Sequence, residues 1–110
     1  MEHEGARELT ADEAFELFTH PYRRRLLMTL LDHNPEDEAK IPEDLTTNDE
    51  ELQEMLVGMT HTHLPRLEAL DIIEWDREKN VVTRGPAFEE LEPLLTLVDD
   101  HRDELPDGWL

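Results

Sequence analysis

The clearest pattern of apolar and polar positions lies in residues 60–85, where a helical repeat is followed by two short β-prone runs. Leucines recur every three residues over 64–70, which places them on one face of a helix. The β-branched and aromatic runs at 72–75 and 81–83 are separated by polar residues, as in a β-hairpin. The pattern predicts a helix that leads into a hairpin, with Asp71 in the left-handed conformation where the helix ends.

Three further helices are predicted before residue 46. Thr10 and Glu13 fit a capping box, in which each side chain bonds the backbone N–H of the other residue, so a first helix should begin there. Pro21 disfavours helix at the residue before it and suits the first turn of a new helix, whose apolar stripe runs to about Asp32. The segment 41–45 has room only for a short helix.

A longer helix is predicted at 49–70, with Asn48 among its capping residues. Apolar residues repeat at i, i+3, i+4 and i+7 from Leu52 to Met59. Pro65 leaves two arrangements open, since it either kinks one helix or lies in the first turn of a second helix, where its missing N–H is not needed. We favour one kinked helix because the apolar face continues through the proline.

The remaining residues predict a last helix and an irregular tail. Gly85 and Pro86 are expected to be the N-cap and the first residue of that helix. We therefore predict a mainly α fold with a small β-hairpin, arranged as a winged helix-turn-helix with an added C-terminal helix. This domain should span residues 10–104, between a flexible N-terminus at 1–9 and an irregular tail at 105–110.

The chain also resembles a known family, small haloarchaeal winged-helix proteins, in the motifs HPYRRRLL, HTHLPRL and EWDREKNVV. Residues 63–73 are similar to the end of the recognition helix in arsenic-repressor-like transcriptional regulators. The resemblance covers roughly residues 15–95. It implies a recognition helix within 49–70 that enters a DNA groove, while a wing at 72–84 lies beside it.

The composition adds an extreme acidic charge to this picture. The 110 residues carry 29 acidic and 10 basic side chains, for a formal net charge of −19. Self-repulsion among so many acids destabilises a compact state in dilute buffer, whereas in molar salt the Debye length falls to about 3 Å and the repulsion is screened. The acids are spread along the whole chain, which favours a halophilic archaeon over an acidic partner-binding protein of an ordinary cell.

Several functional classes lack their characteristic residues. The chain has no Cys and no Ser, which excludes disulfides, thiolate metal sites and serine or cysteine nucleophiles. It has no Gly-rich phosphate loop, no leader pattern and no apolar run near the ~20 residues of a membrane span. His61 and His63 diverge by about 200° on a helix and cannot chelate one ion there, and His63 is expected to be half-buried against a neighbour. We expect a cytoplasmic protein that is not an enzyme and uses no metal or cofactor.

We expect the chain to bind double-stranded DNA in transcriptional control. The side chains expected to face the groove are those of Thr60, His61, Thr62 and Arg66. Those expected to touch phosphate are Arg77 and Lys79 on the wing, and Arg23, Arg24 and Arg25 upstream. The three adjacent arginines have an alternative interpretation, in which they are solvated or paired with the abundant acids.

The expected recognition surface is not basic, which leaves a second function open. Residues 60–85 contain four basic residues and five acids, whereas an ordinary DNA-binding module is much more positive. The alternative is a winged-helix protein-interaction module without DNA binding. A homodimer through the first and last helices is also expected, because they carry more apolar residues than one small core absorbs: Phe15, Phe18, Leu94, Leu95 and Val98.

Overall fold

The computed structural model describes residues 9–33, 37–107 and 109. These residues are mostly helical with a small three-stranded antiparallel sheet, which confirms the predicted combination of helices with a β-hairpin. Residues 1–8 of the predicted flexible N-terminus lie outside the described residues, as do 108 and 110 of the predicted tail. The elements in chain order are α1 (Ala11–Glu16), α2 (Pro21–Asp32), β1 (Ala39–Lys40), α3 (Asp49–Gly58), the π-helical segment η1 (Met59–His63), α4 (Leu64–Ala69), β2 (Ile73–Asp76), β3 (Val81–Arg84), α5 (Phe88–Asp100) and the 3-10 turn η2 (Arg102–Glu104).

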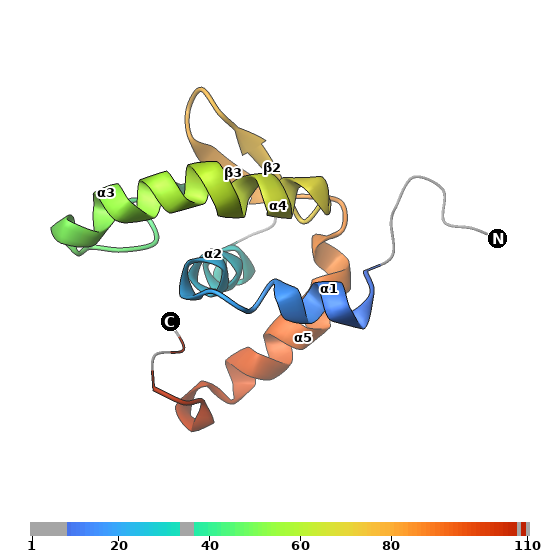
Figure 1. The fold of residues 1–110 in the computed structure, drawn as a ribbon. Coiled ribbons are helices and arrows are strands. Elements are labelled where there is room, and N and C mark those ends of the chain that lie inside the picture. Colours follow the sequence, from blue (N-terminus) through green and yellow to red (C-terminus); the bar gives the residue numbers. More distant parts are fainter. Residues whose placement is uncertain (1–8, 34–36, 108, 110) are drawn as a thin grey trace.

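α3, η1 and α4 form one continuous helix over residues 49–69, called the long helix below (Figure 1). In its middle segment the N–H of Leu64 donates to the carbonyl of Met59, five residues back. An α-helix would set the ring of Pro65 against the carbonyl of His61, four residues before it. The wider π turn relieves that contact, so one helix passes through the proline, as the continuing apolar face predicts.

α2 lies in the middle of the molecule, with the long helix above it and α5 below it in Figure 1. It contacts η1, β1 and α5. The side chains of Leu26, Leu27 and Leu30 on α2 have no exposed surface. The other fully buried large side chains include Met55, Met59, Leu64, Leu67, Ile72 and Phe88. The core is therefore closed mainly between α2, the long helix, the hairpin and α5.

The sheet has the strand order β1-β3-β2. β2 and β3 form the predicted hairpin, in which Ile73 lies opposite Arg84. The two residues of β1 pair with Val81 and Val82 on the other edge of β3. The sequence does not predict β1, because two residues in a charged loop cannot show an alternating pattern.

The predicted short helix at 41–45 is wrong, because this segment forms turns with a cis peptide bond before Pro42. The N–H of Ile41 donates to the carbonyl of Asn80 at 3.0 Å, and the Asn80 side-chain amide donates to the Ile41 carbonyl at 3.1 Å. These two bonds hold the start of the segment along the hairpin, and the N–H groups of Asp44 and Leu45 donate to the carbonyls of Lys40 and Pro42, both at 2.9 Å. The connection from β1 to α3 is therefore a compact turn.

The ends of the helices follow the predicted capping residues with one exception. Thr10 and Glu13 form the expected capping box, Asn48 caps α3, and Asp71 has the left-handed φ of 63° after α4. α5 instead begins at Phe88, after Ala87, and not at Pro86 as predicted.

Gly85 has a different role from the predicted helix cap. Its N–H donates to the carbonyl of Ile72 at 2.8 Å, and the N–H of Ala87 donates to the carbonyl of Asp71 at 2.8 Å. A Cβ at Gly85 would lie 2.5 Å from the Asp71 carbonyl oxygen. Glycine is needed because the end of β3 passes directly against the backbone where the long helix enters the hairpin.

Candidate nucleic-acid interface

The long helix has an exposed face without charge in its central part. Gln53, Val57 and His61 are spaced four residues apart, which places them on one face, and all three are exposed, as is Thr62. We call these four residues the outer stripe. The side chain of Val57 is 51% exposed, and residues 55–67 contain no acid. The stripe is thus an uncharged surface on a very acidic protein.

Two of the four groove-facing residues predicted from the sequence, His61 and Thr62, lie on the outer stripe. Thr60 is only half-exposed. Sequence reasoning missed Gln53 and Val57. The absence of acids from 55–67 is a signal that could have found Val57, and the four-residue spacing leads from Val57 back to Gln53.

The hairpin turn carries two of the predicted phosphate contacts. Arg77 lies over the ring of Trp75, with 4.1 Å between the guanidinium carbon and the ring centre, and its Nη2 donates to Glu68 of α4 at 2.9 Å. Lys79 is exposed, and the structure shows no acid of the described residues paired with its ammonium group. The turn is fixed by Asp76, whose Oδ1 accepts from the backbone N–H groups of Glu78 and Lys79 at 3.1 and 3.2 Å.

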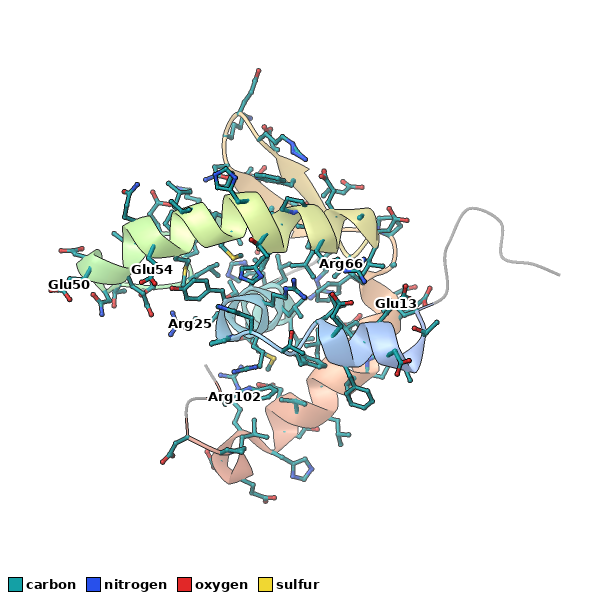
Figure 2. All side chains as sticks on the ribbon, viewed as in Figure 1. Glu13, Arg25, Glu50, Glu54, Arg66 and Arg102 are labelled. Carbon is teal, nitrogen blue, oxygen red and sulfur yellow. The ribbon has the colours of Figure 1, made fainter. Side chains whose placement is uncertain are left out.

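Arg66, predicted to face the groove, is held on another side of the helix. Its Nε and Nη2 donate to the two carboxylate oxygens of Glu16 at 3.0 and 2.6 Å. Figure 2 shows Arg66 on the side of the long helix that faces α1. The hydrogen bond from Arg66 is the largest cause that lowers the pKa of the Glu16 carboxyl. Arg66 therefore ties the long helix to α1, away from the outer stripe.

Arg23 lies in the interior, which corrects the expected three-arginine phosphate patch. Its side chain is buried, its Nε donates to Nδ1 of His63 at 2.9 Å, and its Nη1 donates to the carbonyl of Glu16 at 3.2 Å. Successive residues of a helix point about 100° apart, so three consecutive arginines do not present one surface.

The two neighbouring arginines reach other parts of the molecule. Arg24 donates to the carbonyl of Trp109 at 2.6 Å and to that of Phe18, and it lies over the Trp109 ring. Arg25 donates to Glu51 at the start of α3 at 2.9 Å. The expected pairing with acids is thus seen for Arg25, and also for Arg23, whose Nη1 lies 3.7 Å from a carboxylate oxygen of Glu16. Arg24 and Arg25 help to hold separate segments against α2.

His63 is buried and bonded to a neighbour, as its place on the apolar row predicts. Because Nδ1 accepts the hydrogen bond from Arg23, the ring proton of the neutral imidazole is on Nε2. Burial, followed by the charges of His20 and Arg23, lowers the pKa of His63 to about 4. The ring of His20 packs 4.4 Å from that of His63, and burial also lowers the pKa of His20.

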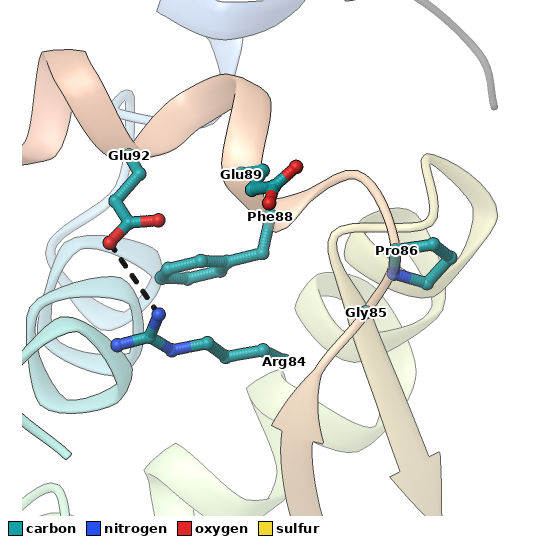
Figure 3. A pocket seen from close by; sticks show the side chains of 6 residues that line it. All are labelled: Arg84, Gly85, Pro86, Phe88, Glu89 and Glu92. Carbon is teal, nitrogen blue, oxygen red and sulfur yellow. Dashed lines mark ion pairs between the residues drawn. The ribbon is translucent and has the colours of Figure 1, made fainter. Parts of the chain in front are cut away.

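Arg84 belongs to the hairpin, but its side chain caps the C-terminal end of α2. Its guanidinium donates to the carbonyls of Leu30, Leu31 and His33 at 2.9, 3.2 and 3.0 Å, which are the last carbonyls of that helix and its cap. It also lies over the ring of Phe88 and 3.6 Å from Glu92. Figure 3 shows this cation within the pocket that Arg84 lines together with Gly85, Pro86, Phe88, Glu89 and Glu92. The guanidinium in this pocket is already bound to the protein itself.

The described residues show no metal site and no membrane span. None of their groups of His, Asp and Glu brings three potential metal ligands together. None of their helices is long and apolar enough to cross a membrane.

Residues 15–83 match the family described as Domain of unknown function (DUF7344). The chain belongs to this family. The matched DUF7344 region runs from within α1 to the last part of β3, so it contains the outer stripe and the hairpin turn, while α5 lies beyond it. The comparisons with curated proteins and with solved structures found no match.

Proposed function

We propose that this DUF7344 protein is a DNA-binding transcriptional regulator built on a winged helix-turn-helix. The order of elements supports this proposal, since α2 is followed by an edge strand, the long helix and a β-hairpin. The strand order β1-β3-β2 places the edge strand and the hairpin in one sheet beside the long helix. In this interpretation the long helix is the recognition helix, β2 and β3 form the wing, and the turn at 41–45 replaces the usual second helix.

The observation that carries the proposal is the uncharged outer stripe beside a hairpin turn that bears Arg77 and Lys79. An acid at an exposed helical position has little effect on folding, and this chain places acids on most of its other helical surfaces. Their absence from 55–67 is explained if this face meets a polyanion, because a carboxylate there would be repelled by phosphate. The wing cations would lie beside the same groove.

The proposed contacts are His61 and Thr62, with Thr60 at their edge, to bases, and Arg77 and Lys79 to phosphate. Arg23 is left out because it is buried, and Arg66 because its two bonds to Glu16 hold it on the side of the long helix that faces α1 (Figure 2). Few phosphate contacts are consistent with a halophilic setting, since counterion release contributes little when the bulk salt is already molar. Affinity would then rest on hydrogen bonds and shape.

The test is retention of sheared genomic DNA from a halophilic archaeon in molar KCl. The double change Arg77→Glu and Lys79→Glu should abolish retention, and the exposed turn should keep the change in free energy of unfolding within about 0.5 kcal/mol. The single change Lys79→Glu should weaken retention, whereas Arg102→Glu, which alters the net charge equally in η2, should leave it unchanged. Background recovery for the wild type would reject DNA binding.

A protein-interaction module is the second candidate, and one observation favours it. Each arginine of the described residues donates to, or pairs with, a group of the protein itself: Arg23, Arg24, Arg25, Arg66, Arg77, Arg84 and Arg102. Guanidinium groups used in this way are not available to phosphate unless internal bonds break. A DNA-free module would keep partner binding when Arg77 and Lys79 are replaced and lose it when exposed apolar residues on its helices are replaced.

A further inference from the structure

Gln53 and Val57 are exposed on the long helix at a spacing that suits reading of base edges. They lie four residues apart, and His61 follows at the same spacing. With a rise of 1.5 Å per helical residue, each step is about 6 Å. Successive base pairs are about 3.4 Å apart along one strand, so neighbouring stripe residues lie roughly two base pairs apart.

The chemistry of these two side chains selects particular bases. A glutamine amide carries one donor face and one acceptor face, which match the N6 donor and N7 acceptor of adenine in the major groove. The methyl groups of valine match the C5 methyl of thymine. An exposed valine is unfavourable in water, and 51% of Val57 is exposed, so contact with a thymine methyl would remove apolar surface from solvent.

The acids near Gln53 include Asp49 and Glu50, which precede it by four and three residues on the same face of α3. Glu51 is bonded to Arg25 of α2 at 2.9 Å. The charge of Glu54 is the second largest cause, after burial, that raises the pKa of the Tyr22 hydroxyl, and Glu54 itself is exposed. Figure 2 shows Glu50 and Glu54 on the part of α3 before the acid-free segment. Gln53 and Val57 therefore lie within one helical turn of an acid, whereas His61 and Thr62 lie in the acid-free part of the stripe.

We propose that Gln53 and Val57 are the specificity-determining residues of this protein, and that its preferred site contains an adenine and a thymine about two base pairs apart. This inference rests on the proposed DNA binding. In this proposal uncharged side chains recognise the bases, and His61 is the next residue along the stripe. Arg77 and Lys79 contact the DNA phosphates and fix the position of the protein on the duplex.

The experiment is selection of bound duplexes from a random library in molar KCl, with the wild type and three variants. The wild type should enrich sequences that share the adenine and the thymine. Gln53→Glu should replace the adenine preference by cytosine, because a carboxylate accepts from the cytosine N4 amino group. Val57→Ala should lose the thymine preference. The Gln53 and Val57 variants should each bind the wild-type site about tenfold to one-hundredfold more weakly.

Thr96→Ala, an exposed position on α5, is the control and should keep both the enriched sequence and the affinity. Unchanged sequences for both stripe variants would overturn the inference and leave DNA binding in place. DNA retained by the wild type without any shared sequence would do the same. Failure of the wild type to retain any DNA would overturn the proposed function itself, so the two failures are distinguishable.

Discussion

At the scale of single residues, the pair of Arg23 and His63 joins two segments 40 positions apart through one buried hydrogen bond of 2.9 Å. A guanidinium has no acceptor atom and stays charged, so the imidazole must remain neutral to accept its hydrogen. The neighbouring ring of His20 and the burial of the site favour the same neutral state. The hydrogen bond between Arg23 and His63 therefore requires a neutral imidazole in the folded protein.

This dependence predicts a change of stability with pH. The pKa of His63 is about 4 in the folded protein, against the ordinary value of 6.5 for histidine. The unfolded chain therefore binds more protons between these two values, and stability falls as the pH falls. The free energy of unfolding should rise by roughly 1 kcal/mol from pH 5 to pH 6.5, measured by denaturant unfolding in molar KCl. His63→Gln, which keeps an acceptor for Arg23, should flatten this rise. An equally steep rise in the variant would assign it to other groups.

Residue-level prediction succeeded where neighbours in the chain decide the outcome. The Thr10 capping box and the left-handed Asp71 depend on local bonds, and both are confirmed. The partners of Arg23 and Arg84 are 40 and about 54 residues away, and no local pattern specifies them. From the sequence alone, an arginine in a hairpin is expected to be a wing cation. Arg84 instead donates to the carbonyls at the end of α2.

At the scale of elements, prediction again succeeded where a local pattern decides the structure and failed where contacts between distant segments decide it. The long helix was predicted because its apolar face continues through Pro65, but the π turn that makes this possible has no sequence signature of its own. β1 exists only through its pairing with β3. The predicted helix at 41–45 is replaced by turns because its backbone bonds the hairpin residue Asn80.

Two glycines test how tightly the elements approach one another. A Cβ at Gly85 would lie 2.5 Å from the Asp71 carbonyl oxygen and 2.8 Å from the Ile73 nitrogen, both backbone atoms, whereas a Cβ at Gly58 would meet the Tyr22 ring at 3.7 Å. Gly85→Ala should destabilise the protein by about 1–3 kcal/mol. Gly58→Ala should stabilise it by up to about 1 kcal/mol, since alanine favours a helix interior. Denaturant unfolding of both variants measures the two signs, and a neutral Gly85→Ala would contradict the close approach.

At the scale of the whole molecule, the net charge of −19 governs stability in a way that no single contact does. Ion pairs such as Arg66 with Glu16 involve only a minority of the acids. The remaining carboxylates repel one another, and salt screens this repulsion. The thermal midpoint should therefore rise as KCl is increased from dilute to molar. A midpoint that stays flat or falls would remove the halophilic interpretation, and with it the account of DNA binding through few phosphate contacts.

The predicted homodimer also belongs to this scale, and the structure changes the surface available to it. Leu95 has no exposed surface, so it cannot form an interface, and Phe18 is half-buried with its ring centre 6.0 Å from that of Trp109. Of the other predicted residues, Phe15 is 64% exposed, and Leu94 and Val98 are half-buried. Leu97, which is outside the predicted set, is 57% exposed. Phe15 and Leu97 lie on α1 and α5. An apolar surface on these two helices still supports association of two copies.

Light scattering in molar KCl at micromolar protein should therefore give the mass of a dimer. Leu97→Glu should shift it to a monomer, because association would bury a carboxylate without a partner. Val57→Glu introduces the same group at an equally exposed apolar position on the long helix, and it should leave the dimer intact while weakening DNA retention. A wild type that is only monomeric would reject the dimer. Loss of the dimer in Val57→Glu but not in Leu97→Glu would place the interface on the long helix and leave that helix unavailable to DNA.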